Sequence, residues 1–222
     1  MVKLRTVFFD IDNTLFPTDE FAKLARKRAV KAMVAAGLKA SEAQAYSTLI
    51  KLVRKYGAND QHHFDRLLKE FGMQRNPRII AAGVIAYHGA KERLAPYPDT
   101  IPTLHTLHRK GLKLYALTRG VDVKQWDKLI RLGLQDLFDG VFVTCKKNKA
   151  FYSCVQRKLH LRPGEAAMVG DNPRIDVIPA NSVGLVTIHL MKGKHAKDEG
   201  SSQATFRIRS LRELAKIFQK LR

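Results

Sequence analysis

A chain of 222 residues with 45% hydrophobic and 27% charged side chains has the composition of a soluble globular protein with one or two domains. No uncharged apolar run approaches the ~20 residues of a membrane-spanning helix, and Asp10 and Asp12 interrupt the only apolar run near the N-terminus. This excludes a signal-peptide core and favours a cytoplasmic protein without a membrane partner.

The formal net charge of +20 predicts attraction for anions such as phosphorylated metabolites or nucleic acid. The excess is spread along the chain: residues 17–95 carry fifteen basic and seven acidic residues, and the rest carries twenty-five and thirteen. A dedicated nucleic-acid tail would concentrate the charge in one segment. We therefore interpret most of it as a solvated basic surface, which leaves nucleic acid a possible partner that is not favoured.

The first predicted element is a buried strand at residues 7–9, and four helices follow it without an intervening strand. Their apolar residues keep helical spacing, and Gly37, Gly57 and Gly72 are suited to end the first three. The four helices are expected at residues 21–36, 41–56, 60–71 and 77–93. This pattern predicts an inserted all-helical domain at residues 17–95, between the two parts of a core formed by residues 1–16 and 96–222.

From residue 100 onward, helices and strands alternate. The predicted helices lie at 100–110, 122–132, 148–160 and 173–182, and the strands at 112–118, 140–144, 166–170 and 184–190. A polar loop at 192–203 and a short apolar patch around Phe206 and Ile208 precede a last helix at 211–221. Alternation predicts parallel strands with right-handed crossovers, and the apolar strands fit burial on both faces. The expected fold is α/β, with a three-layer, Rossmann-like parallel sheet core.

The positions of Trp126 and of the two cysteines predict which side chains join the core and whether the cysteines bind a metal. Trp126 shares helical spacing with Leu129 and Ile130, and Cys154 falls at an apolar helix position, so both are expected in the core. The two cysteines, Cys145 and Cys154, have no further Cys or His at metal spacing. Neither a disulfide framework nor a zinc site is predicted.

Acidic, hydroxyl and basic residues follow the ends of separate predicted strands. In an open parallel sheet these ends share one edge, which is where ligands bind. The residues concerned are Asp10, Asp12, Thr118, Lys146, Lys147, Lys149, Asp171 and Asp176.

Several carboxylates at one edge repel each other unless a cation neutralises them, and Mg²⁺ is a hard cation that prefers oxygen ligands. A metal ion and a lysine together form a positively charged binding site for a phosphoryl group. Asp10 could then attack phosphorus and form an acyl phosphate, which divides one difficult step into two. Asp12 could protonate the leaving oxygen and then deprotonate the attacking water.

The segments "FFDIDNTLF", "LYALTRG" and "MVGDNPRID", with the lysine after the third core strand, resemble the four motifs of the haloacid dehalogenase-like hydrolase superfamily. Their order and spacing match over nearly the whole chain. The helical insert resembles the cap of the subfamily that carries its cap between the first two motifs. The resemblance implies a Mg²⁺-dependent phosphatase that hydrolyses a small phosphorylated metabolite through an aspartyl-phosphate intermediate.

The resemblance also implies a role for each acid. Asp10 would be the nucleophile and a metal ligand, and Asp12 the general acid/base, with its backbone carbonyl touching the metal. Asp171 would bind Mg²⁺ directly. Asp176 would hold a metal-bound water or the lysine, although an acid at that position could also merely cap the helix that begins near Ile175.

The hydroxyl and basic residues receive substrate-binding roles. Thr14 would orient Asp12, and Thr118 with the backbone N–H of Arg119 would hold phosphoryl oxygens. Lys146 falls where the catalytic lysine of the family usually lies, and Lys147 and Lys149 remain competitors. Two residues depart from the family pattern: Arg119 replaces a common Asn, which implies a different or additional cationic contact with the leaving group, and Lys147 replaces a usual Pro.

Other functions remain open beside a metabolite phosphatase. A phosphomutase or a phosphatase of nucleotides or nucleic-acid ends would use the same motifs. A 2-haloacid dehalogenase would need neither a metal nor Asp12. An RNA-binding protein with a vestigial site would use the basic surface, but no basic run interleaved with aromatic residues forms a stacking platform.

Overall fold

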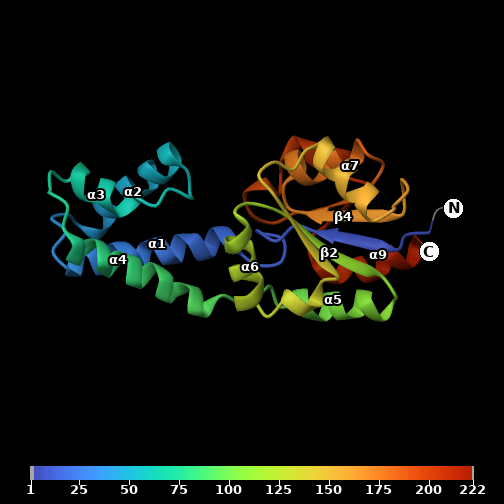
Figure 1. Cartoon of the computed structure of the whole chain (residues 1–222), viewed down its shortest axis with the longest axis horizontal. Coiled ribbons are helices and arrows are strands. Elements are labelled where there is room, and N and C mark those ends of the chain that lie inside the picture. The colour runs from blue at the N-terminus through green and yellow to red at the C-terminus, as the bar shows by residue number, and fades with distance from the viewer. Residues whose placement is uncertain (1–2, 222) are drawn as a thin grey trace. The chain divides into compact units, whose positions relative to one another are not determined.

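A computed structural model describes residues 3–221, so residues 1, 2 and 222 of the expected core lie outside the described range. Within that range the sheet is parallel throughout, with the strand order β3-β2-β1-β4-β5-β6 (Figure 1). Its strands are β1 (Thr6–Phe9), β2 (Lys113–Arg119), β3 (Gly140–Thr144), β4 (Ala166–Gly170), β5 (Val186–Leu190) and β6 (Phe206–Ile208). The predicted α/β class is confirmed.

Helices cover both faces of this sheet. Figure 1 shows α5 (Thr100–Arg109) and α9 (Leu214–Lys220) on one face and α7 (Lys149–Lys158) on the other. The remaining core helices are α6 (Asp122–Arg131) and the short α8 (Ile178–Asn181). The three layers expected of a Rossmann-like core are therefore present.

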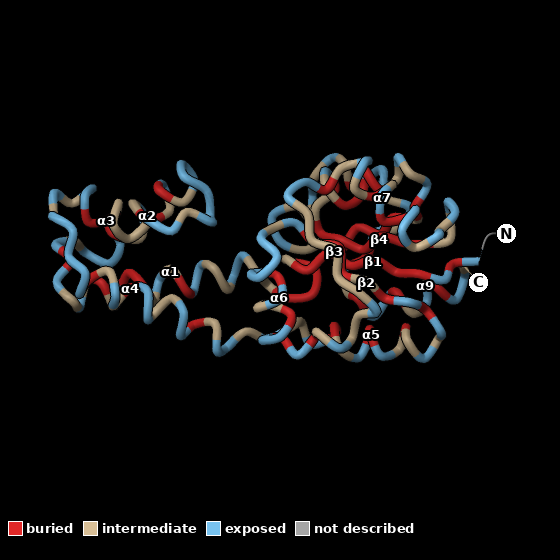
Figure 2. The backbone as a smooth tube through the Cα atoms, viewed as in Figure 1, coloured by how far each residue is buried: buried red, intermediate tan, exposed pale blue. Residues whose placement is uncertain are grey.

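The centre of the sheet is the most deeply buried part of the core. Every residue of β1 and β4 is buried, which explains why both strands consist largely of apolar residues (Figure 2). Phe8 and Met168, from these neighbouring strands, share one apolar cluster with Tyr152 and Val155 of α7. This packing fixes the carboxyl ends of β1 and β4 side by side.

Several local features differ from the sequence-based expectations. The apolar patch at residues 206–208 forms a sixth parallel strand, β6, because it pairs with the edge of β5. The loop expected at 192–203 contains short 3-10 turns, and the expected helix at 173–182 begins as a π-helical turn, Pro173–Val177. The last helix is preceded by a 3-10 turn, Leu211–Glu213, which Ser210 caps.

The chain divides into two compact units, Met1–Thr18 with Ala95–Arg222 and Asp19–Leu94. The second contains nearly all of α1 (Thr18–Ala35), and α2 (Glu42–Tyr56), α3 (His63–Glu70), α4 (Pro77–Gly89) and a 3-10 turn, Ala90–Arg93. None of the described helices combines the length and the apolar character that crossing a bilayer requires.

The helical unit has its own apolar core. Ser41 forms a capping box at the start of α2, and Asn76 caps α4, whose first residue is Pro77. A Cβ atom at Gly83 would lie 2.7 Å from the Met33 side chain, so α4 approaches α1 closely because residue 83 has no side chain. Buried Leu49, Leu67 and Ile79 are among the residues that complete this core.

Two side chains expected in the core are exposed. Helix α7 buries Tyr152, Val155 and Gln156, so Cys154 lies on its solvent face. Helix α6 buries Gln125 and Leu129, which leaves Trp126 39% exposed. Apolar spacing alone did not determine which face of these helices contacts the sheet.

A buried carboxylate, Asp99, ties the end of the chain to the start of α5. Asp99 Oδ2 accepts hydrogen bonds from Ser210 Oγ at 2.7 Å and from the Leu211 backbone N–H at 2.9 Å. Burial would raise the pKa of Asp99, but the Ser210 hydrogen bond and the charge of Lys192 hold it below its ordinary value of 3.8. Asp99 therefore stabilises the folded chain as a carboxylate.

Replacing Asp99 should destabilise the protein in a pH-dependent way. Asp99→Ala should lower the free energy of unfolding at pH 7 by about 2 kcal/mol, because two donors lose a charged acceptor. Since the pKa is depressed in the folded state, this stabilisation is complete above the unfolded pKa and is lost as the pH falls through the folded pKa. Urea unfolding at pH 7 and pH 3 measures the difference.

The exposed Asp136 provides the control. Asp136→Ala should change the free energy of unfolding by no more than about 0.5 kcal/mol at either pH. An Asp99→Ala deficit that equals the control at pH 7, or that grows in acid, would contradict the assigned role.

Candidate active site

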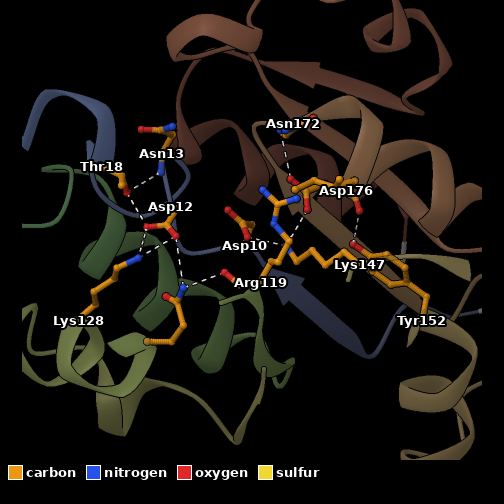
Figure 3. A network of polar contacts seen from close by, with 12 residues as sticks. Asp10, Asp12, Asn13, Thr18, Arg119, Lys128, Lys147, Tyr152, Asn172 and Asp176 are labelled. Atoms are coloured by element: carbon orange, nitrogen blue, oxygen red, sulfur yellow. Dashed lines mark hydrogen bonds and ion pairs between the residues drawn. The ribbon is translucent and has the colours of Figure 1, made fainter. Parts of the chain in front are cut away.

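The turn after β1 begins the candidate site. The backbone N–H of Asp10 donates to Val169 of β4 at 2.9 Å, which continues the sheet pairing into the first acid. Asn13 adopts a left-handed conformation, φ 57°, and the N–H groups of Thr14 and Leu15 donate to the Ile11 carbonyl. The resulting tight turn places Asp10 and Asp12 beyond the carboxyl end of β1 (Figure 3).

Three buried carboxylates converge at this edge of the sheet. Asp10 follows β1, Asp171 follows β4, and Asp176 lies in the π-helical turn. One oxygen of each lies within 4.8 Å of the others. A Cβ atom at Gly170 would overlap the Asp176 carboxylate, so glycine at the end of β4 is needed for this close approach. Three of the four residues expected at the metal, Asp10, Asp171 and Asp176, are therefore adjacent through their carboxylates.

A fully buried lysine lies against two of these acids. Lys147 Nζ donates to Asp10 Oδ1 at 2.5 Å and to Asp176 Oδ1 at 2.7 Å (Figure 3). Burial would lower the pKa of Lys147, but the charges of Asp10 and Asp176 outweigh burial and raise the pKa above its ordinary value. The ammonium group therefore remains charged inside the site.

The expectation that Lys146 lies at the acids is not met. Its side chain is exposed, as is that of Lys149 at the start of α7. The Thr144 hydroxyl hydrogen-bonds both backbone groups of Lys146, which turns the chain so that Lys147 points inward. Asn148 then caps α7 through the Phe151 N–H.

The electrostatics of Asp10 favour an additional cation. Burial is the main cause that raises the pKa of Asp10 from 3.8 to about 7. The negative charges of Asp176 and Asp12 contribute to this increase, and the positive charge of Lys147 opposes it. A divalent cation would stabilise the charged carboxylate, and three buried carboxylates are the hard oxygen donors that suit Mg²⁺. The residues present therefore fit the expected metal.

The carboxylate of Asp12 lies outside this cluster and has its own partners. Its Oδ1 accepts hydrogen bonds from Thr18 Oγ1 at 2.7 Å and from Lys128 Nζ at 2.6 Å, and its Oδ2 accepts from Lys128 Nζ at 2.8 Å. Figure 3 shows Asp12 between Thr18 and Lys128. Sequence reasoning missed both partners. Lys128 gave no signal because a lysine on the polar face of a helix is usually a solvated residue.

The expected role of Thr14 in orienting Asp12 is not seen. Thr14 is fully buried, and its hydroxyl has no hydrogen-bond partner within residues 3–221; the Thr18 hydroxyl contacts Asp12 instead. The two threonines are four positions apart, and the sequence pattern could not distinguish which of them reaches the carboxylate.

Thr118, at the end of β2, is another fully buried threonine whose hydroxyl lacks a partner in the described part of the chain. An unsatisfied buried hydroxyl at a ligand-binding edge is suited to an oxygen-rich ligand. The side chain of the next residue, Arg119, is exposed, and its backbone carbonyl accepts from Gln125 Nε2 at 2.9 Å. The edge thus combines a cluster of three carboxylates, a buried ammonium and a buried hydroxyl without a partner among the described residues.

Comparisons with known proteins agree with this geometry. Residues 4–184 match the family model described as haloacid dehalogenase-like hydrolase. Two relatives named glyceraldehyde 3-phosphate phosphatase, from Methanopyrus kandleri and Methanocaldococcus jannaschii, are 40% and 38% identical to the chain. The first match covers 98% of each chain and the second covers 99% of each.

A solved structure also resembles the whole chain. The HAD phosphatase from Thermococcus onnurineus has a TM-score of 0.69 and 28% identity, with 96% of this chain and 97% of the other covered. The family model and the near-complete alignments with phosphatases agree with each other and with the motif positions. The chain belongs to the haloacid dehalogenase-like hydrolases, and it is a phosphatase of that family.

Proposed function

We propose that this protein is a Mg²⁺-dependent phosphatase that hydrolyses a small phosphorylated metabolite through a phosphorylated Asp10. The observation that carries the proposal is the convergence of Asp10, Asp171 and Asp176, of which Asp10 and Asp176 bind the buried Lys147. A carboxylate nucleophile needs positive charge beside it before a negatively charged phosphoryl group can approach. The buried ammonium supplies part of that charge.

The remaining charge would come from the metal. Asp10 and Asp171 would hold Mg²⁺ with carboxylate oxygens, Asp176 would assist, and the backbone carbonyl of Asp12 would complete the protein ligands. When bound, the metal supplies electrostatic stabilisation of the phosphoryl oxygens. Lys147 would keep the Asp10 carboxylate oriented through Oδ1, which leaves Oδ2 available.

The chemistry would proceed in two transfers. In the first, an oxygen of Asp10 forms a bond to phosphorus while the ester P–O bond breaks, and Asp12, which must carry a proton when this step begins, transfers that proton to the leaving oxygen and becomes a carboxylate. In the second, Asp12 removes a proton from water, the water oxygen bonds to phosphorus, and the bond to Asp10 breaks. The products are the alcohol and inorganic phosphate; Asp10 is again a free carboxylate, and Asp12 again carries the proton that it removed from water.

Thr118 would hold the phosphoryl group during both transfers. Its buried hydroxyl, which has no partner within the described residues, would donate to a phosphoryl oxygen. The backbone N–H of Arg119 would bind a second oxygen. The exposed Arg119 side chain and the surface residues Lys146 and Lys149 remain candidates for contacts with the rest of the substrate.

Glyceraldehyde 3-phosphate is our first candidate substrate. The support is the identity of 40% and 38% to relatives named for this activity, across nearly their whole length. The positive net charge also favours an anionic substrate. A nucleotide or a sugar phosphate that undergoes transfer rather than hydrolysis would use the same catalytic groups, so the substrate must be tested directly.

The first test is phosphate release from glyceraldehyde 3-phosphate and from 4-nitrophenyl phosphate. Both should be hydrolysed with Mg²⁺ present, and EDTA should stop the release. Asp10→Asn should reduce kcat by at least about 1,000-fold, because an amide is a poor nucleophile. Asp136→Asn, at an exposed acid, should retain wild-type activity.

Full activity in Asp10→Asn would refute the proposed nucleophile. Activity that is unchanged by EDTA would refute the metal requirement. Isomerisation of a sugar phosphate without net phosphate release would instead assign a mutase. Hydrolysis of nucleotides but not of triose phosphates would change the substrate while retaining the mechanism.

The second test compares two adjacent lysines. Lys147→Met should lower the free energy of unfolding in EDTA by about 3 kcal/mol, because it leaves Asp10 and Asp176 buried without their cation. Lys146→Met, at the exposed neighbour, should change it by less than about 0.5 kcal/mol. Urea unfolding measures both.

The same pair of variants separates their roles in phosphate release. Lys147→Met should be nearly inactive, whereas Lys146→Met should change mainly KM if its side chain contacts substrate. Equal stability losses in the two variants, or an inactive Lys146→Met beside an active Lys147→Met, would reverse the assignment of the lysine.

A further inference from the structure

The carboxylate of Asp12 is held by residues outside the family motifs found in the sequence. Lys128 Nζ, from α6, lies 2.6 Å from Oδ1 and 2.8 Å from Oδ2 of Asp12, so one ammonium binds both oxygens. Figure 3 shows the Lys128 side chain extending from α6 to this carboxylate. We propose that Lys128 is a positioning residue that fixes Asp12 for proton transfer to the leaving oxygen; this inference rests on the proposed phosphatase function.

The surroundings of Lys128 strengthen this ion pair. The Lys128 and Asp12 side chains are only 23% and 31% exposed, so solvent screens their attraction less than it would at an open surface. The ammonium group also lies 5.8 Å from the centre of the Phe16 ring. Phe16 belongs to the same turn region as Asp12, so the lysine is bound to that region twice.

Gln125 fixes the helix that carries Lys128. Gln125 precedes Lys128 by three positions, which places both on one face of α6. Gln125 is buried, its Nε2 donates to the Arg119 carbonyl at 2.9 Å, and it reaches Asp12 Oδ2 at 3.5 Å. Gly120 follows Arg119 in the chain and has φ +158°. A Cβ atom at Gly120 would overlap the Gln125 amide. This interlock joins α6 to the carboxyl end of β2.

The other contacts of Asp12 cannot replace Lys128. Thr18 Oγ1 binds Oδ1 at 2.7 Å and also accepts from the Asn13 N–H at 3.2 Å. Without Lys128, Oδ1 would retain this hydroxyl, but Oδ2 would retain only the long contact with Gln125. The carboxylate would then rotate more freely, and fewer of its orientations would present an oxygen to the leaving group.

The dependence of the rate on the leaving group distinguishes positioning from a general structural role. An alkoxide is strongly basic and needs a proton as the P–O bond breaks, whereas 4-nitrophenolate is stable without one. The kcat/KM value reports the first transfer, in which Asp12 donates that proton. A misplaced Asp12 should therefore penalise alkyl phosphates far more than aryl phosphates.

The experiment measures kcat/KM for a series of phosphate monoesters that runs from 4-nitrophenyl phosphate to alkyl phosphates and glyceraldehyde 3-phosphate. Lys128→Met should reduce kcat/KM by about tenfold or more for the alkyl esters, within the range that general acid catalysis contributes, and by less than about threefold for 4-nitrophenyl phosphate. Lys128→Arg should recover most of the loss. Lys124→Met, at an exposed lysine of the same helix, should match the wild type.

A double variant tests whether Lys128 acts through Asp12. In an Asp12→Asn background, Lys128→Met should cause no further change in leaving-group dependence. An equal loss for every ester, an added loss in the Asp12→Asn background, or faster alkyl ester cleavage by Lys128→Met would overturn the proposal. If Lys128→Met does not fold, Lys128→Gln decides by the same comparison.

Two outcomes separate this inference from the proposed function. If the wild-type protein releases phosphate from no ester, the proposed function fails, and the ion pair is then tested by urea unfolding alone. Lys128→Met should lower the urea midpoint of the wild type but not that of Asp12→Asn. If the wild type is an active phosphatase with unchanged leaving-group dependence in Lys128→Met, only the positioning role fails.

Discussion

The ion pairs of Lys147 with Asp10 and Asp176 are the interaction on which the site depends. A fully buried ammonium is costly unless acceptors surround it, and buried carboxylates at one sheet edge are costly unless a cation separates them. The buried Lys147 ammonium and the buried carboxylates of Asp10 and Asp176 therefore stabilise one another. The parallel sheet makes the arrangement possible, because β1 and β4 are neighbours and end at the same edge, so carboxylates distant in sequence lie within one cluster.

The fold was largely predictable because its physical requirements are visible in the sequence. Strands buried on both faces must be apolar throughout, and alternation with helices implies parallel pairing, so β1 to β5 were anticipated. Strand β6 was less visible: three residues at the edge of a sheet carry too short a pattern, and pairing with β5 determines their conformation. The exposure of Trp126 and Cys154 depends on how α6 and α7 rotate against the sheet, which spacing alone does not fix.

The candidate site was predictable in its acids and less so in their partners. Asp10, Asp171 and Asp176 were identifiable because each follows a strand end or lies a few residues beyond it. Three lysines within four residues gave no such signal; in the fold, Lys147 is the one that pairs with the buried acids, and the Thr144 hydroxyl binds the backbone of the exposed Lys146. Lys128 reaches Asp12 across 116 residues of sequence. A contact of that separation depends on how α6 is held at the carboxyl end of β2, where Gln125 binds the Arg119 carbonyl, and local patterns do not encode this.

The central claim is that these carboxylates share one divalent ion beside a nucleophilic Asp10. A crystal structure of the protein with Mg²⁺ and beryllofluoride, a mimic of a phosphoryl group bound to a carboxylate, tests it most directly. The account predicts beryllium bonded to an Asp10 oxygen, Mg²⁺ bound by Asp10 and Asp171, and Lys147 Nζ still in contact with the site. Beryllofluoride on another residue, or Mg²⁺ bound away from Asp10 and Asp171, would contradict it.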